Sequence, residues 1–359
     1  MMMSVMLLLA GLAALVAGAE GLVRGASRLA LATGLSPLVV GLTVVGFGTS
    51  APELAVGIDA VQRGSADIAL GNVVGSNITN VLLILGISAL VAPLVVSRQL
   101  VRIDVPVMIA CSVLVLVLAM DGSIGRIEGA VMAAGAAAYL VLQVVIGRRE
   151  AKPDELEPVD EKPGATGWVL NVALLLGGLG LLVLGAGWLV DGAVDIASAL
   201  GLSELVIGLT VVAIGTSMPE LATSVIATIR GERDMAVGNV VGSNILNLLA
   251  VLGLTAVFSP AGIPVGNSAL HFDLPVMLAA AVACLPIFFT GHCIQRWEGA
   301  VFAGYFIAYT AYLLLDSAGH GALQAFSAVM MNFVVPLTIL TLAIVVTRAL
   351  RERQQARRG

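Results

Sequence analysis

Two short stretches place a carboxylate and two hydroxyls inside strongly apolar sequence. GTSAPE covers residues 48–53, and GTSMPE covers residues 215–220. Residues three and four apart share one face of a helix, so Thr49, Ser50 and Glu53 can point to the same side. Oxygen atoms of carboxylates, hydroxyls, amides and carbonyls are the ligands that hard cations prefer. The residue types and their spacing therefore favour a cation site, for Ca²⁺ or for Na⁺.

A second doubled motif follows each of the first two. GNVVGSNITN covers residues 71–80 and GNVVGSNILN covers residues 238–247, and each brings a serine and an asparagine to one helix face. Pro52 removes a backbone donor and should break its helix, which would free carbonyl oxygens just before it. Backbone of this kind is tolerated at membrane depth where it lines a cavity or is buried in protein. The candidate ligands are Gly46, Thr49, Ser50, Glu53, Ser76 and Asn80 in the first set, and Ala213, Thr216, Ser217, Glu220, Ser243 and Asn247 in the second.

The composition indicates an integral membrane protein surrounded by the lipid bilayer. Of 359 residues, 59% are hydrophobic and 11% are charged, against about 45–50% and about 25% in soluble domains. Apolar runs close to 20 residues long recur along the chain, as in membrane-spanning helices. The three cysteines and three histidines are scattered, which implies neither a disulfide framework nor a zinc site. We expect no cofactor, no nucleic-acid partner and no obligate protein partner.

The apolar runs predict eleven spanning helices. Five precede a polar, acidic segment and five follow it, at about 5–31, 37–62, 67–92, 103–119 and 126–147, then at about 168–200, 204–229, 235–258, 272–290 and 297–316. An eleventh run covers 326–346. We therefore expect a first repeat at 1–147, an acidic linker at 148–167, a second repeat at 168–316 and an extra helix with a basic tail at 317–359. Asp104 and Asp273 are expected to mark helix starts.

The two halves are copies of one another. Subtracting 167 from a position in the second half gives its counterpart in the first, and residues 41–86 match residues 208–253 at 29 of 46 positions. Because each repeat holds an odd number of spans, the second must cross the membrane upside down. Inverted repeats are typical of secondary transporters. The predicted fold is all-α and membrane-integral, with a ten-helix inverted 5+5 core plus an eleventh C-terminal helix. Glu20 has Gly187 as its counterpart, so it lies outside the duplicated site but could line an ion pathway.

Basic residues predict the orientation. With eleven spans and the N-terminus outside, sixteen of the eighteen lysines and arginines fall on the cytoplasmic side, and Arg63 and Arg126 remain outside. Cytoplasmic segments carry the excess of positive charge in membrane proteins. We expect a multi-pass protein of the plasma (inner) membrane with a cytoplasmic C-terminus and a cytoplasmic acidic linker.

The paired motifs G-T-S-x-P-E and G-N-x-x-G-S-N-x-x-N resemble the two alpha-repeats of the sodium/calcium exchanger branch of the Ca²⁺/cation antiporter superfamily. The resemblance covers about residues 5–316. It implies a core of eight helices that carries the site, with the first and sixth helices sliding across it. It also implies that Glu53 and Glu220 are central carboxylates shared by Ca²⁺ and Na⁺, that the hydroxyls and amides named above complete the two half-sites, and that the carbonyls of Gly46 and Ala213 bind Na⁺.

The resemblance implies Na⁺/Ca²⁺ antiport by alternating access, with Ca²⁺ extrusion driven by Na⁺ entry. Asn247 stands where potassium-dependent relatives carry Asp, which argues against K⁺ dependence. The proton-coupled branch has Asn-Ala where this chain has Thr-Ser, so H⁺/Ca²⁺ antiport is the alternative and a cation channel the more distant one. The intramembrane protease motifs HExxH and GxGD do not occur in the sequence, and we do not expect an enzyme.

Overall fold

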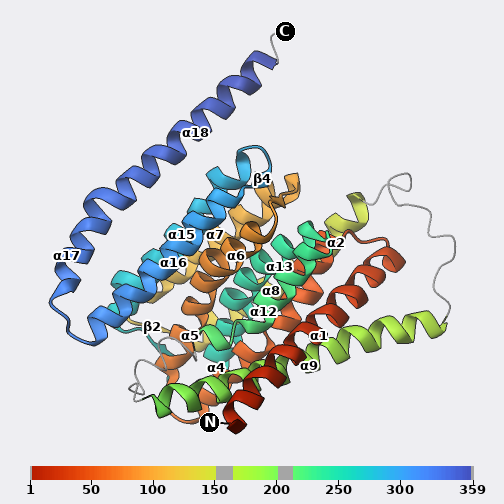
Figure 1. Cartoon of the computed structure of the whole chain (residues 1–359), viewed down its shortest axis with the longest axis horizontal. Helices are drawn as coiled ribbons and strands as arrows, with labels where there is room; N and C mark the ends of the chain where they lie inside the picture. The colour runs from red at the N-terminus through yellow and green to blue at the C-terminus, as the bar shows by residue number, and fades with distance from the viewer. Residues whose placement is uncertain (1, 151–164, 201–212, 357–359) are drawn as a thin grey trace.

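The computed structural model describes residues 2–150, 165–200 and 213–356 (Figure 1). Within these ranges, ten helical segments are long and apolar enough to span a membrane, and Met218–Ile229 is a shorter apolar helix. These elements confirm the predicted all-α membrane fold. Most of the predicted linker at 148–167, and the first part of the helix predicted at 204–229, lie outside the described residues.

The first repeat consists of five spans, three of which change helix type or break along their length. The elements are α1 (Met2–Thr33), α2 (Pro37–Val40), η1 (Gly41–Val45), α3 (Gly46–Thr49), α4 (Ala51–Gln62), α5 (Ala66–Ile78), η2 (Thr79–Ile84), α6 (Leu85–Val91), β1 (Leu94–Val95), η3 (Leu100–Asp104), α7 (Val105–Leu118), η4 (Ala119–Asp121), β2 (Ser123–Ile124) and α8 (Arg126–Glu150). η1, η2 and η3 are single π-helical segments within otherwise α-helical spans, and η4 is a 3₁₀ turn.

The second repeat has the same order where it is described. Its elements are α9 (Ala165–Ala199), α11 (Ala213–Gly215), α12 (Met218–Ile229), α13 (Arg233–Leu246), η6 (Asn247–Val251), α14 (Leu252–Phe258), β3 (Ile263–Pro264), η7 (Ala269–Asp273), α15 (Leu274–Phe289), β4 (Cys293–Ile294) and α16 (Arg296–Ser317). The π-helical segments η6 and η7 stand at the positions of η2 and η3. The duplication seen in the sequence thus extends to departures from α-helical geometry.

The first helix of each repeat forms a long antiparallel pair, α1 with α9, along one side of the bundle (Figure 1). Glycines spaced seven apart bring the two backbones together. A Cβ added to Gly11 would lie 2.7 Å from the Gly185 carbonyl oxygen, and one added to Gly178 would lie 2.6 Å from the Gly18 carbonyl oxygen. These distances leave room for hydrogen alone, so the two helices pack at a separation that only glycine allows. We call this contact the α1–α9 seam.

The remaining helices of the two repeats interlock around a pseudo-twofold axis. Gly86 on α6 packs against Gly299 on α16, and the counterparts Gly129 on α8 and Gly253 on α14 pack against one another in the same way. Two short antiparallel strand pairs repeat the relation, β1 with β4 and β2 with β3. Each contact joins one repeat to the other, which confirms that the two copies are inverted and form a single core.

Asp104 and Asp273 do not mark helix starts. Their spans begin four residues earlier, at Leu100 and Ala269, and each aspartate lies where a π-helical segment passes into α7 or α15, without making a side-chain cap. Asp104 is fully buried and accepts hydrogen bonds from Tyr139 Oη at 3.2 Å and Gln143 Nε2 at 2.5 Å. Asp273 accepts one from Tyr309 Oη at 2.8 Å. The two carboxylates therefore tie α7 to α8 and α15 to α16, because a carboxylate withdrawn from water needs hydrogen-bond donors.

The predicted eleventh helix consists of α17 (Ala322–Val329), η8 (Met330–Val334) and α18 (Val335–Ala356), on the side of the bundle opposite the α1–α9 pair (Figure 1). It is attached to the core through Tyr305, whose hydroxyl donates to Thr338 Oγ1 at 2.6 Å. Large apolar side chains remain exposed along it, among them Phe333, Leu337 and Leu340. Such a surface suits contact with lipid.

Candidate cation site

Each of the two GTSxPE motifs breaks a helix within the bundle. α3 ends at Thr49, Ser50 adopts φ −81° and ψ 2°, and α4 begins at Ala51 with Pro52 at its second position. Ser217 adopts nearly the same conformation, φ −89° and ψ 9°, before α12. Proline lacks the N–H that would continue the earlier helix. The break predicted from the sequence is therefore present twice.

The break puts each glutamate in the first turn of a new helix. Glu53 lies in the first turn of α4 and Glu220 in the first turn of α12, and both are 0% exposed. Helix N-termini carry a partial positive charge that favours a carboxylate. The Glu220 carboxylate also lies close enough to Glu53 for their like charges to interact. Two buried carboxylates at facing helix starts give a site that suits a divalent cation.

Buried oxygen atoms without a hydrogen-bond partner collect at this site. Among the described side chains, they include Ser50 Oγ, Glu53 Oε2, Asn80 Oδ1, Ser217 Oγ, both Glu220 carboxylate oxygens and Asn247 Oδ1. An unsatisfied buried polar group costs about 1–3 kcal/mol, and a charged one costs more. All seven atoms belong to residues that the sequence proposes as ligands, and all are oxygens. The donor set therefore fits a hard cation as its bound partner.

Asparagines at the pseudo-twofold axis orient the two candidate amide ligands, Asn80 and Asn247. Asn77 Nδ2 and Asn244 Nδ2 each donate to the other's carbonyl oxygen, at 3.4 and 3.5 Å. Asn80 Nδ2 donates to Asn244 Oδ1 at 3.0 Å, and Asn247 Nδ2 donates to Asn77 Oδ1 at 3.4 Å. Because these bonds occupy the amide nitrogens, the oxygens of Asn80 and Asn247 remain as acceptors. Asn77 and Asn244 thus fix the orientation of the Asn247 and Asn80 side chains.

The serines of the second motif differ in their partners. Ser76 Oγ donates to Glu53 Oε1 at 3.4 Å, within its own repeat. Ser243 Oγ instead crosses to the first repeat, donating to the Gly46 carbonyl oxygen at 3.3 Å and lying 3.3 Å from Thr49 Oγ1. The Gly46 carbonyl also accepts from Ser50 N at 3.1 Å, so the break does not free it as the sequence suggests.

The other candidate ligands of the second repeat lie near the edge of the described region. Ala213 opens α11, and its contacts lie outside what the structure describes; Thr216 lies between α11 and α12. Ser217 N donates to the Ile214 carbonyl oxygen at 3.1 Å. Among the described side chains, contacts join Glu53 to Ser76 and Thr49 to Ser243, and the asparagines of the axis join Asn80 to Asn247. Ser50 and Ser217 stand at the two helix breaks.

Three further buried hydroxyls are not among the residues that the motifs single out. Ser88, Thr223 and Thr255 are fully buried, and their oxygens have no partner among the described residues. Ser88 and Thr255 are counterparts under the same offset of 167. A hydroxyl residue that persists at the same position in both copies of an apolar helix is a signal that could have found them.

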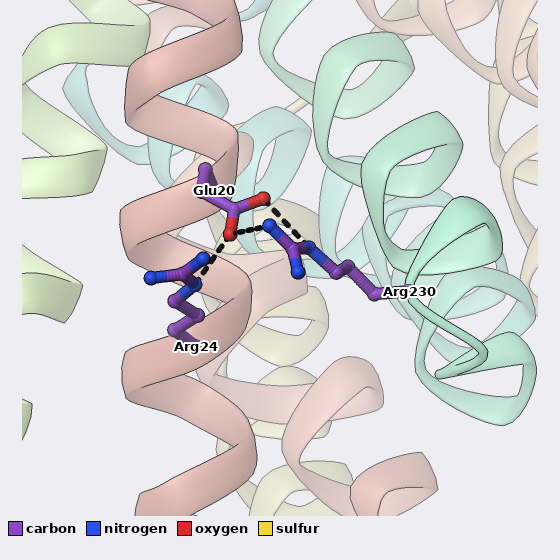
Figure 2. Close-up of polar contacts among 3 residues, drawn as sticks. All are labelled: Glu20, Arg24 and Arg230. Carbon is purple, nitrogen blue, oxygen red and sulfur yellow. Dashed lines mark hydrogen bonds and ion pairs between the residues drawn. The ribbon is translucent and has the colours of Figure 1, made fainter.

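The C-terminal end of α12, which we call the α12 rim, is joined to α1 by ion pairs (Figure 2). Arg230, the residue that caps α12, donates from Nε to Glu20 Oε2 at 2.9 Å and contacts Glu20 Oε1 through Nη2. Arg24 contacts the same carboxylate from one turn along α1. Nearby, Ser27 Oγ donates to Glu232 Oε1 at 2.6 Å. The sequence left Glu20 as a possible lining of an ion pathway; the structure shows it fastening α1 to the end of α12.

Comparisons with known proteins agree with the fold and the motifs. The sequence profile of the family described as "Sodium/calcium exchanger protein" matches residues 3–145 and 170–315. The protein named CaxA of Alkalimonas amylolytica is 42% identical over 88% of this chain and 100% of its own length. The sodium/calcium exchanger MaX1 of Methanosarcina acetivorans is 33% identical over 86% of this chain and 97% of its own. A solved structure of the sodium-calcium exchanger NCX_Mj superimposes with a TM-score of 0.75 at 32% identity, over 87% of this chain and 99% of that one.

Proposed function

The chain belongs to the sodium/calcium exchanger family of cation/Ca²⁺ antiporters, and from that premise we propose that it exchanges Na⁺ for Ca²⁺ by alternating access. We propose further that Na⁺ entry drives Ca²⁺ extrusion across the plasma membrane. The observation that carries the proposal is the cluster of buried, unpartnered oxygens around Glu53 and Glu220.

The proposed ligands are the twelve residues of the two motifs. The carboxylates of Glu53 and Glu220 bind either ion, and their two negative charges match one Ca²⁺. Hydroxyls, amides and backbone carbonyls complete the two half-sites: Gly46, Thr49, Ser50, Ser76 and Asn80, with Ala213, Thr216, Ser217, Ser243 and Asn247. Ca²⁺ accepts six to eight such oxygens in flexible geometry. The same oxygens, without nitrogen or sulfur, also suit Na⁺.

Charge explains why the two fluxes are coupled. A carboxylate left without a counter-ion inside a membrane costs at least about 2.5–3.5 kcal/mol on insertion scales. A site with two ionised glutamates therefore resists passage through a closed state until Ca²⁺ or Na⁺ neutralises it. One set of oxygens serves both ions, so loading with one excludes the other.

The moving part in this proposal is the α1–α9 pair. The seam holds its two helices in backbone contact, so they can shift as one body. On the core side, α9 presents Leu179 to Gly48 and Val190 to Gly215, the glycines that open the two motifs. A shift of the α1–α9 pair would therefore change the side chains that pack against both broken helices at the same time.

The orientation is part of the proposal, with the N-terminus outside and the C-terminus in the cytoplasm. Arg24 and Arg230, which the count of basic residues assigns to the cytoplasmic side, meet at Glu20 in the structure. That meeting puts both residues at one membrane face, as the assignment requires. The α12 rim is then the cytoplasmic one.

The test is uptake of radiolabelled Ca²⁺ into proteoliposomes of the purified protein. Vesicles loaded with Na⁺ or with choline are diluted into Na⁺-free buffer, and a parallel set carries an imposed pH gradient. Uptake that requires internal Na⁺ supports the proposal, and the variant Glu53→Gln should abolish it. Asp59→Asn is the matched control, since Asp59 is an exposed acid farther along α4 that pairs with Arg63.

Two other results would contradict the proposal. Uptake driven by the pH gradient without Na⁺ would place the protein among H⁺/Ca²⁺ antiporters, for which two buried carboxylates could carry the protons. Equal uptake with no counter-ion inside would indicate a channel.

A further inference from the structure

The hydroxyl of Thr49 lies among three oxygen atoms of the protein. Thr49 is fully buried, and its Oγ1 lies 3.2 Å from Asn239 Oδ1, 3.3 Å from Ser243 Oγ and 3.4 Å from the Gly46 carbonyl oxygen. A threonine hydroxyl has one proton and two lone pairs. To bind a cation, it must turn the proton away and offer a lone pair.

Asn239 can accept this proton. Thr49 also has the Glu220 carboxylate within reach as a second acceptor, but a cation bound by that carboxylate would take the place of the proton. Asn239 Oδ1 is the nearest of the three oxygens, and an amide oxygen accepts hydrogen bonds without donating any. Ser243 Oγ already donates to the Gly46 carbonyl. With the Thr49 proton directed to Asn239, the lone pairs of Thr49 are left for an ion.

Two contacts on the second repeat fix the amide of Asn239. Its Nδ2 donates to Ser224 Oγ at 3.0 Å and lies 3.5 Å from the Glu220 carbonyl oxygen. Because the nitrogen is held toward α12, the oxygen faces α3 of the first repeat. Asn239 thus ties the helix that carries Glu220 to a ligand of the other half-site.

In the first repeat, the residue equivalent to Asn239 has no hydroxyl partner equivalent to Ser224, and the packing shows why. The counterpart of Asn239 is Asn72, which is partly exposed and, among the described residues, donates to the Glu53 carbonyl oxygen at 3.2 Å. The counterpart of Ser224 is Gly57. A Cβ there would lie 2.7 Å from Thr255 Oγ1, so the threonine takes the space that a serine would need. Asn72 therefore has no hydroxyl at position 57 to orient it.

We propose that Asn239, oriented by Ser224, is a positioning residue for ion binding that holds the Thr49 hydroxyl with its oxygen toward the bound cation. The inference rests on the proposed function in taking Thr49 as a ligand. It adds that α12 and α13 of the second repeat orient a ligand of the first half-site.

The test compares Ca²⁺ binding by detergent-purified variants in titration calorimetry. Asn239→Ala should weaken binding by about tenfold, the effect of one hydrogen bond to a ligand, and Asn72→Ala, the matched control, by less than about twofold. Ser224→Gly, which installs the mirrored residue, should reproduce part of the loss and serves if Asn239→Ala does not fold.

A double-variant cycle separates positioning from packing. If Asn239 acts through Thr49, then Asn239→Ala should add nothing to Thr49→Val. Losses that multiply, or an Asn72→Ala effect equal to that of Asn239→Ala, would overturn the inference.

Calorimetry needs no ion gradient, so the two proposals can fail separately. A wild-type protein that binds Ca²⁺ but does not exchange it for Na⁺ would contradict the proposed function and leave the cycle interpretable. A wild-type protein that exchanges the ions while the two losses multiply would overturn the inference alone. If the wild-type protein binds no Ca²⁺, both fall.

Discussion

The ends of α12 and α4 are counterparts in the duplication, yet they are attached to the rest of the molecule differently. Arg230 at the end of α12 pairs with Glu20 of α1 and shares that carboxylate with Arg24. Arg63 at the end of α4 pairs with Asp59 of its own helix, and both side chains are largely exposed. At the place of Glu20, α9 carries Gly187.

This difference shows that the two copies have kept a common centre and changed at the rim. The carboxylates, the asparagines of the axis and the broken helices are the same in both. Ion pairs attach α1 to the end of α12. Among the described residues, no equivalent ion pair attaches α9 to the end of α4. An exchanger must bind the same ions from both faces, but its two open states need not have equal energy.

Substitution of either central glutamate should have the largest effect, a loss of Ca²⁺ uptake. Glu53→Gln and Glu220→Gln should each reduce Na⁺-dependent Ca²⁺ uptake by at least about thirtyfold, since each leaves one charge to face a divalent ion in a buried site. Uptake by proteoliposomes measures both. Retention of a tenth of wild-type activity by one variant alone would show that the centre is not functionally symmetric.

A substitution in the α1–α9 seam should have the next largest effect, on thermal stability. Gly178→Ala would place a Cβ 2.5 Å from Leu22 N and should destabilise the protein by about 1–3 kcal/mol through overpacking. Gly177→Ala, one residue earlier, meets nothing within 4 Å and is the matched control. The thermal unfolding midpoint in detergent should fall for the first and not for the second. Equal midpoints would mean that the two backbones separate easily.

Removing the ion pairs at the end of α12 should have a moderate effect on the balance between the two open states. Arg230→Gln removes partly exposed ion pairs worth up to about 1 kcal/mol, so the balance between open states should shift by up to about fivefold. If the pair closes the cytoplasmic rim, fewer molecules will face outward and the external Ca²⁺ concentration for half-maximal uptake will rise. Arg63→Gln is the control from the other rim, and an equal rise there would remove the distinction between the two ends.

Adding the missing carboxylate should have the smallest effect. Gly187→Glu places the counterpart of Glu20 on α9, where a Cβ meets nothing within 4 Å, and offers Arg63 a partner when α9 approaches α4. We expect a rise of about twofold in the same external Ca²⁺ concentration. Gly187→Gln tests whether charge is responsible, and a rise of the same size in that variant would exclude the ion pair.

The sequence predicts the centre of this molecule better than its connections. The offset of 167 and the placement of Pro52 are enough to identify the broken helices, the paired glutamates and the inverted fold. Asp104 is different, because a helix start and a buried tie to Tyr139 give the same local pattern. The link from Asn239 to Thr49 depends on side chains 190 positions apart meeting across two helices, which no periodicity encodes. The two-residue strands likewise depend on pairing between the repeats.

The seam between α1 and α9 has one more consequence. Gly11 meets Gly185 as Gly178 meets Gly18, so each contact occurs twice with the partners exchanged. This is the geometry of an isologous interface, the kind that joins two identical subunits in a symmetric dimer. Here one chain forms both sides of the interface, so a substitution changes one side only. A single gene can therefore hold a glutamate at position 20 and a glycine at position 187, which no homodimer could do.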